Sequence, residues 1–171
     1  MPVPPTIDSK AQAVTVARRD GQLAVIATRR VNAGAAVLTI DGPVVAVPTR
    51  YTVQVGEREH VDAEARADGS HPIWRFLNHA CEPNTRLVGR TLVARSDIEV
   101  GDEVTFDYDT TEWDMAAPFP CRCGAASCRV VIRGYRHLTA ALREQLVDAA
   151  PHLRQAASRS TDPPEEPRVI S

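Results

Sequence analysis

Short segments in which apolar and polar residues alternate fill the first two thirds of the chain and predict a mainly β structure. Val/Ala/Ile-rich stretches at 13–16 and 22–28 flank Asp20-Gly21, a pair typical of a tight hairpin turn. A second hairpin is expected around Gly89-Arg90, and the polar stretch 63–72 predicts a loop. The strands expected beyond the first hairpin are 37–40, 44–47, 51–55, 60–62, 85–88, 91–94 and 103–108.

The last third of the chain changes to a helical pattern. Apolar residues recur at helical spacing between Leu138 and Leu153 and predict one helix near 138–150 that packs its apolar stripe on the core. Pro151 is expected to disturb the end of this helix, because proline has no N–H to donate.

Size and hydropathy indicate an ordinary globular domain. A chain of 171 residues can bury a core without depending on disulfides. It has no run of 18 apolar residues, so neither a membrane span nor a membrane partner is expected. Residues 1–10 lack the basic start and long apolar stretch of a secretory signal, which makes the cytoplasm the expected compartment.

The charge balance argues against direct binding of nucleic acid. Twenty basic residues against 22 acidic ones give a net charge of −2, so no overall positive field attracts phosphates. Lys10 is the single lysine, and all the other basic residues are arginines. This bias indicates a GC-rich genome and, in so short a chain, a bacterial source.

The four cysteines favour a metal site over disulfides. CRCGAASC at 121–128 places three sulfurs within eight residues, a spacing that suits thiolate ligands in a reducing compartment. A closed tetrahedral zinc site needs a fourth ligand, and Cys81 is the one cysteine that remains. We therefore predict a structural zinc site; a disulfide and inert thiols are the alternatives. The predicted ligands are Cys81, Cys121, Cys123 and Cys128.

Four stretches, in order along the chain, resemble the signatures of the SET-domain protein lysine methyltransferases. They are ATRRVNAGAAVL at 27–38, RFLNHACEPN at 75–84, GDEVTFDYD at 101–109 and CRCGAASCRVVIRG at 121–134. The resemblance implies a β-clip fold of several short sheets, in which the segment with the Asn-His-x-Cys motif is threaded under a loop to form a pseudoknot. It also implies that the last stretch is a zinc-binding post-SET segment.

The resemblance assigns roles to particular residues. Tyr108 matches the family's tyrosine at the methyl-transfer site, and Tyr51 matches, more loosely, a tyrosine of the lysine channel. Asn78 and His79 match residues that contact the cofactor S-adenosylmethionine, and Arg75 stands where the family often has a cofactor-side arginine. Phe106 and Trp113 are candidate aromatic walls of the site.

The chain departs from the family pattern at three positions of consequence. Gln22 and Ala24 occupy the positions of a G-x-G pair whose small size lets the backbone approach the cofactor, so both belong to the expected cofactor site. Val130 stands where a glycine usually follows the last zinc cysteine.

The resemblance implies methyl transfer from S-adenosylmethionine to the ε-amine of a lysine in a protein or peptide. A free lysine has a pKa of about 10.4, and a dry aromatic channel lowers that pKa so that the amine becomes a nucleophile. The alternatives are a degenerate SET scaffold that acts as a zinc-stabilised binding module and an unrelated zinc-stapled scaffold. The expected divisions are a flexible start (1–10), a SET domain (11–115), a post-SET zinc segment (116–135), a C-terminal helix (136–156) and a disordered tail (157–171).

Overall fold

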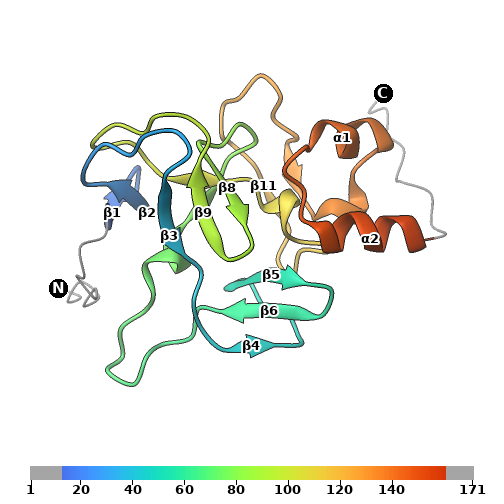
Figure 1. The fold of residues 1–171 in the computed structure, drawn as a ribbon, viewed down its shortest axis with the longest axis horizontal. Helices are drawn as coiled ribbons and strands as arrows, with labels where there is room; N and C mark the ends of the chain where they lie inside the picture. The colour runs from blue at the N-terminus through green and yellow to red at the C-terminus, as the bar shows by residue number, and fades with distance from the viewer. Residues whose placement is uncertain (1–12, 161–171) are drawn as a thin grey trace.

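The computed structural model describes residues 13–160 and consists of several small sheets with two helices on one side (Figure 1). The expectation of a flexible start at 1–10 concerns residues outside this range, as does most of the expected disordered tail. Among the described residues, no helix is both long enough and apolar enough to cross a membrane.

The first hairpin forms as the sequence predicts. Strands β1 (Val14–Arg19) and β2 (Gln22–Ala27) are antiparallel, with Arg19 opposite Gln22. Asp20 and Gly21 between them both have positive φ, 48° and 84°. This is the pattern of the two-residue hairpin turns whose twist matches that of the strands.

The structure has two three-stranded antiparallel sheets, one near the centre of the view in Figure 1 and one along its lower edge. The predicted second hairpin is confirmed, because the turn at Gly89-Arg90 joins β8 to β9. The first sheet has the order β3-β9-β8, with β3 at Ala36–Thr39, β8 at Thr85–Val88 and β9 at Thr91–Ala94. The second has the order β4-β6-β5, with β4 at Val44–Val45, β5 at Thr52–Gly56 and β6 at Glu59–Asp62.

A short parallel pair brings two of the signature stretches together. Strand β7 (Asn78–His79) follows the 3-10 helix η1 (Ile73–Phe76) and pairs with β10 (Thr105–Phe106). The side chain of Asn84 strengthens this contact, because its Oδ1 accepts the Thr105 N–H at 3.0 Å. Its Nδ2 donates to the carbonyl of Glu103 at 2.8 Å.

The strand expected at 103–108 is shorter than predicted. Only Thr105–Phe106 is regular strand, because the next side chain ends it. The Asp107 carboxylate accepts the Asp109 N–H at 3.0 Å and starts the 3-10 helix η2 (Tyr108–Thr110). Aspartate side chains offer the backbone this kind of local alternative to a sheet.

Two hydrophobic clusters hold the elements together. The larger one lies among β1, β2, β3 and β9 and includes the fully buried Val25, Ile40 and Leu92. The smaller one packs Tyr135 and Leu153 with Trp113. It fastens the C-terminal helices to the segment that follows η2.

The prediction of one C-terminal helix is wrong, because the structure has two. Helix α1 (Ala140–Gln145) begins at Thr139, whose side chain accepts the Leu142 N–H, and ends where Leu146 leaves helical geometry (φ −80°, ψ 72°). Pro151 begins helix α2 (Pro151–Arg159) instead of ending a helix. Proline suits a first helical position because the N–H it lacks has no partner there. Since α2 continues to Arg159, the expected limit of 156 is also too early.

Val130 occupies a backbone conformation that favours glycine. It precedes β12 (Val131–Ile132), which pairs with β11 (Phe119–Pro120) around the cysteine segment. Its φ is +68°, and the Val131 N–H donates to the Arg129 carbonyl at 2.7 Å, which closes a three-residue turn on Val130. Such turns are strained, most of all for a β-branched residue.

We expect Val130→Gly to stabilise the protein. Relief of the left-handed conformation outweighs the extra freedom of glycine in the unfolded chain, and the net gain is about 0.5–1 kcal/mol. The valine side chain is 65% exposed, so little packing is lost. Urea unfolding of the zinc-loaded protein measures the gain. Val130→Ala is the control and should gain much less, since it keeps Cβ; equal gains in both variants would contradict the strain argument.

Candidate active site and zinc centre

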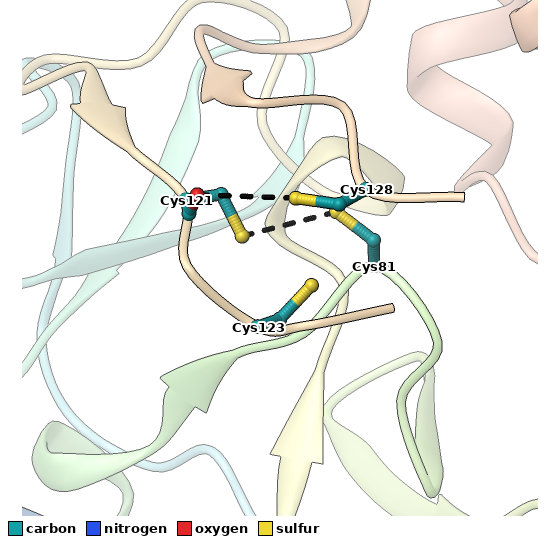
Figure 2. Close-up of side chains that lie close together, drawn as sticks. All are labelled: Cys81, Cys121, Cys123 and Cys128. Carbon is teal, nitrogen blue, oxygen red and sulfur yellow. Dashed lines mark hydrogen bonds between the residues drawn. The ribbon is translucent and has the colours of Figure 1, made fainter. Parts of the chain in front are cut away.

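The four cysteines converge from two separate parts of the chain, as Figure 2 shows. Cys81 follows β7, and the other three lie in the segment between β11 and β12. All four sulfurs lie within 4.8 Å of one another, and Cys81 Sγ is 3.9 Å from Cys121 Sγ. Zinc–sulfur bonds of about 2.3 Å in a tetrahedron place sulfurs about 3.8 Å apart, so the cluster fits zinc.

The chemistry of these thiols also fits a cation. All four cysteines are free, so the disulfide alternative does not form. Burial raises the pKa of Cys81 and raises that of Cys121 to about 11. A dication stabilises the thiolate forms that burial disfavours. Four thiolates fill every position around zinc, which is the pattern of a structural site and leaves none open for substrate.

His79 connects the cysteine cluster to Tyr108. Its Nδ1 accepts the Tyr108 N–H at 3.1 Å, so the ring proton is on Nε2, which lies 3.3 Å from Cys81 Sγ. Burial, together with the positive charge of Arg129, lowers the pKa of His79 to about 3 and keeps the ring neutral. Both nitrogens are used inside the protein. Only the main chain of His79 is therefore left to contact a cofactor.

Tyr108 is held at the centre of an aromatic group. Its hydroxyl donates to the Leu77 carbonyl at 2.5 Å. Its ring centroid lies 4.8 Å from that of Phe106, 5.3 Å from that of His79 and 5.8 Å from that of Phe119. Phe106, a candidate aromatic wall of the site, thus lies directly beside Tyr108.

Of the two predicted aromatic walls, Trp113 does not lie beside Tyr108. Trp113 packs in the second cluster, with its ring 6.4 Å from that of Tyr135, and does not line the surroundings of Tyr108. Phe119, which lines them in its place, gave no sequence signal except its position two residues before Cys121.

The Tyr108 hydroxyl keeps its proton. Burial raises its pKa, and the carboxylates of Glu112 and Glu103 raise it further, because a phenolate there would add a negative charge to an already negative, poorly solvated region. Tyr108 can therefore donate and accept hydrogen bonds but cannot act as a base.

Asn78 contacts the strand that carries Gln22 and Ala24, the two positions at which the chain departs from the family's G-x-G pair. Its Nδ2 donates to the Leu23 carbonyl at 3.2 Å and to Glu103 Oε1 at 2.8 Å. Leu23 lies between Gln22 and Ala24 in β2. The structure therefore brings Asn78 together with both positions. The Gln22 side chain is exposed, whereas Ala24 is 1% exposed.

Tyr51 and Arg75 form a separate pair. The Arg75 guanidinium carbon lies 3.6 Å from the centroid of the Tyr51 ring, and the same guanidinium donates to the Ala63 carbonyl at 2.9 Å. Tyr51 is 40% exposed. Neither a hydrogen bond nor a ring contact joins Tyr51 to Tyr108. Of the predicted site residues, the structure thus groups Asn78, His79 and Tyr108 with the cysteines and leaves this pair at the side.

Glu112 is a buried carboxyl group that no sequence pattern singles out. Its Oε1 accepts the Gln54 N–H at 2.8 Å and the Thr111 hydroxyl at 3.1 Å. Gln54 in turn accepts the Trp113 N–H at 2.8 Å, so the two side chains bind β5 to the segment after Tyr108. Burial raises the pKa of Glu112 to about 7.

The comparisons with known proteins agree with this geometry. A family model described as SET domain matches residues 23–109, about half of the chain. Methyltransferase flvH of Aspergillus flavus is 34% identical over 102 residues, which are 56% of this chain and 57% of flvH. Histone-lysine N-methyltransferase ash1 of Drosophila melanogaster is 36% identical over 85 residues, which are 44% of this chain and 4% of ash1.

A solved structure shows the same fold. KRYPTONITE in complex with mCHH DNA, H3(1-15) peptide and SAH superposes with a TM-score of 0.51 and 25% identity, over 69% of this chain and 29% of that one. The chain belongs to the SET-domain family, and its mainly β SET fold with C-terminal helices is confirmed. It spans less than two thirds of the length of each of these relatives.

We expect one zinc ion per chain, held by all four cysteines. Each cysteine-to-serine variant should bind substoichiometric zinc and unfold at a lower temperature, because the binding free energy of a structural zinc is folding free energy. Elemental analysis and thermal unfolding measure this. Ser127→Ala is the matched control, since Ser127 lies beside Cys128 but bonds Glu82. A serine variant that keeps full zinc occupancy would exclude that cysteine as a ligand.

Glu112 should make stability depend on pH. Its pKa rises from an ordinary 4.5 to about 7 in the folded protein, which therefore keeps a proton that the unfolded chain releases. The stability due to the protonated group is complete below pH 4.5 and is lost as the pH rises toward 7. As the pH rises from 5 to 8, wild type should lose this stability and Glu112→Gln should not. The free energy of unfolding of the variant should therefore rise relative to that of wild type, by up to roughly 3 kcal/mol.

Urea unfolding at the two pH values measures this shift. Glu144→Gln, at an exposed position, is the control and should show no such change. A stability difference between Glu112→Gln and wild type that is the same at both pH values would refute the raised pKa.

Proposed function

We propose that this protein transfers a methyl group from S-adenosylmethionine to the ε-amine of a lysine in a protein or peptide. One observation carries the proposal. The Tyr108 hydroxyl lies against the Leu77 carbonyl, directly beside Asn78 and His79, in a half-buried aromatic site. A neutral phenol and a carbonyl that converge in this way can orient an amine without adding a charge.

The chain contributes positioning more than acid–base chemistry. When bound, S-adenosylmethionine supplies a methyl group on a sulfonium. The Tyr108 hydroxyl donates its hydrogen bond to the Leu77 carbonyl oxygen, so its lone pairs are free to accept a hydrogen bond from the attacking amine. The surrounding rings exclude water and favour the neutral amine over the ammonium. Since Tyr108 cannot become a base, we infer that the lysine loses its proton to solvent before transfer.

The cofactor would lie along the edge where Asn78 meets β2. Asn78 contacts Leu23, so the backbone at Gln22 and Ala24 borders the same region as the main chain of 78–79. The Gln22 side chain is exposed and not packed into the core, which leaves it free to move from an entering ligand. Tyr51 would form the rim of the lysine channel, and Arg75, which the resemblance assigns to the cofactor side, stacks on its ring. Zinc would hold the site without contacting substrate.

The substrate class follows from the relatives and not from the chain alone. The Drosophila relative is named a histone-lysine methyltransferase, and the KRYPTONITE complex holds an H3 peptide. We propose a protein lysine as the acceptor here as well. The arginine-rich composition supports a bacterial source, in which case the acceptor need not be a histone.

A second candidate is a binding module without catalysis. Gln22 and Ala24 in place of two glycines favour it, because the exposed Gln22 side chain adds bulk on the strand that Asn78 contacts. The two candidates differ in one respect that can be measured: only the enzyme requires S-adenosylmethionine.

The test combines cofactor binding and methyl transfer. Calorimetric titration of the zinc-loaded protein with S-adenosylmethionine should give a saturable heat that Asn78→Ala weakens at least tenfold. Tritiated cofactor with histone H3 and with polylysine should label lysine. Tyr108→Phe keeps the ring but loses the hydroxyl, and should lower kcat roughly a hundredfold with little change in cofactor affinity.

Tyr135→Phe is the matched control, since Tyr135 lies in the second cluster and its variant should keep wild-type activity. No heat at millimolar cofactor in a folded sample would refute the enzyme and support the binding module. Binding without lysine labelling of either acceptor would count against lysine transfer, as would full activity in Tyr108→Phe.

A further inference from the structure

Arg129 is a buried cation with no role in the proposed chemistry. It follows the zinc-ligand candidate Cys128 directly, and its side chain is 8% exposed. Its guanidinium forms two ion pairs, one from Nε to Asp109 Oδ2 at 2.9 Å and one with Asp107 Oδ1. The side chains of Asp107 and Asp109 are 3% and 0% exposed. The burial of three charged side chains in one place needs a physical explanation.

The two carboxylates stand on either side of Tyr108 in the chain. Asp107 Oδ1 also accepts the Asp109 N–H at 3.0 Å and so sets the start of η2. Asp109 Oδ1 accepts the Gly134 N–H at 2.9 Å. The backbone before and after Tyr108 is thus held by one planar guanidinium, whose fork fixes direction as well as distance.

Gly134, which donates to Asp109, is also held in place. Gly134 admits no side chain, because a Cβ there would lie 2.7 Å from the Trp113 carbonyl oxygen. The backbone N–H of Arg129 donates to Cys81 Sγ at 3.4 Å. Arg129 is therefore bound both to the cysteine cluster and to the residues that flank Tyr108.

We propose that Arg129 is a positioning residue. It links Asp107 and Asp109 to the cysteine cluster, and this link fixes the position of the Tyr108 ring and hydroxyl. This inference rests on the proposed function, because the position of Tyr108 matters through the methyl-transfer site. Arg129 touches neither the cofactor nor the lysine in this scheme. It acts on the position of Tyr108 alone.

The test separates positioning from folding. Arg129→Lys keeps the charge but loses the fork. Arg129→Met alone would leave two buried carboxylates without their cation. A triple variant, Arg129→Met with Asp107→Asn and Asp109→Asn, removes all three charges together and should therefore fold. Arg122→Lys, at an exposed position in the same segment, is the matched control. Each variant is first checked for one zinc per chain.

The direct readout is the fluorine NMR signal of the Tyr108 ring. The chain has three tyrosines, so fluorotyrosine labelling gives three fluorine NMR signals, and Tyr108→Phe identifies the one from Tyr108. We expect this signal to shift and broaden in Arg129→Lys and in the triple variant, while those of Tyr51 and Tyr135 stay in place. We also expect kcat to fall at least tenfold, with the lysine KM and the cofactor affinity changed less than threefold.

Three results would overturn the proposal. They are an unchanged Tyr108 signal in both variants, an unchanged kcat, and a loss of zinc in Arg129→Lys, which would make Arg129 a support of the metal site instead. If wild type itself shows no methyl transfer, the proposed function fails, yet the NMR signal still decides whether Arg129 orders Tyr108.

Discussion

The convergence of four sulfurs is the constraint on which the rest of this structure depends. It joins Cys81 to a segment 40 residues further along the chain, a loop whose closure costs entropy. The strands that border that segment, β11 and β12, are two residues each and cannot supply much stability on their own. The metal–sulfur bonds would have to supply it. The cysteine segment would thus be ordered by coordination chemistry, whereas the main core, against which Tyr108 packs, is ordered by apolar burial.

The surroundings of Tyr108 follow from this division. The site is polar beneath its aromatic surface: Asp107, Asp109 and Glu112 are all buried within a few residues of the tyrosine. Buried carboxylates are stable only where donors meet them, and the donors here come from distant parts of the chain, namely Arg129 and the backbone of Gln54. Because each of these bonds is directional, the network fixes one arrangement of the site more sharply than apolar packing would.

The sequence predicted what depends on local chemistry or on a family motif. The Asp20-Gly21 hairpin needs only positive φ at adjacent residues, and the cysteine set could be proposed by count and spacing. What it missed depends on contacts between distant segments. Nothing in the run around Glu112 says that this carboxyl group will meet Gln54, because exposed acidic residues look the same. Likewise, a proline can end one helix or begin the next, and at Pro151 the tertiary packing of Leu153 decides between the two.

The two C-terminal helices are fastened to the segment that carries Tyr108. The Ala150 N–H donates to the Thr110 carbonyl at 2.8 Å, and His152 Nε2 lies 2.8 Å from the Thr111 carbonyl. The family match, in contrast, ends at residue 109. The unit recognised by homology is thus smaller than the unit that folds, and a fragment cut at residue 109 would lose Arg129 and Gly134, the partners of Asp107 and Asp109. Boundaries for expression or for grafting this domain belong after α2, because Leu153 of that helix packs with Tyr135 in the second cluster.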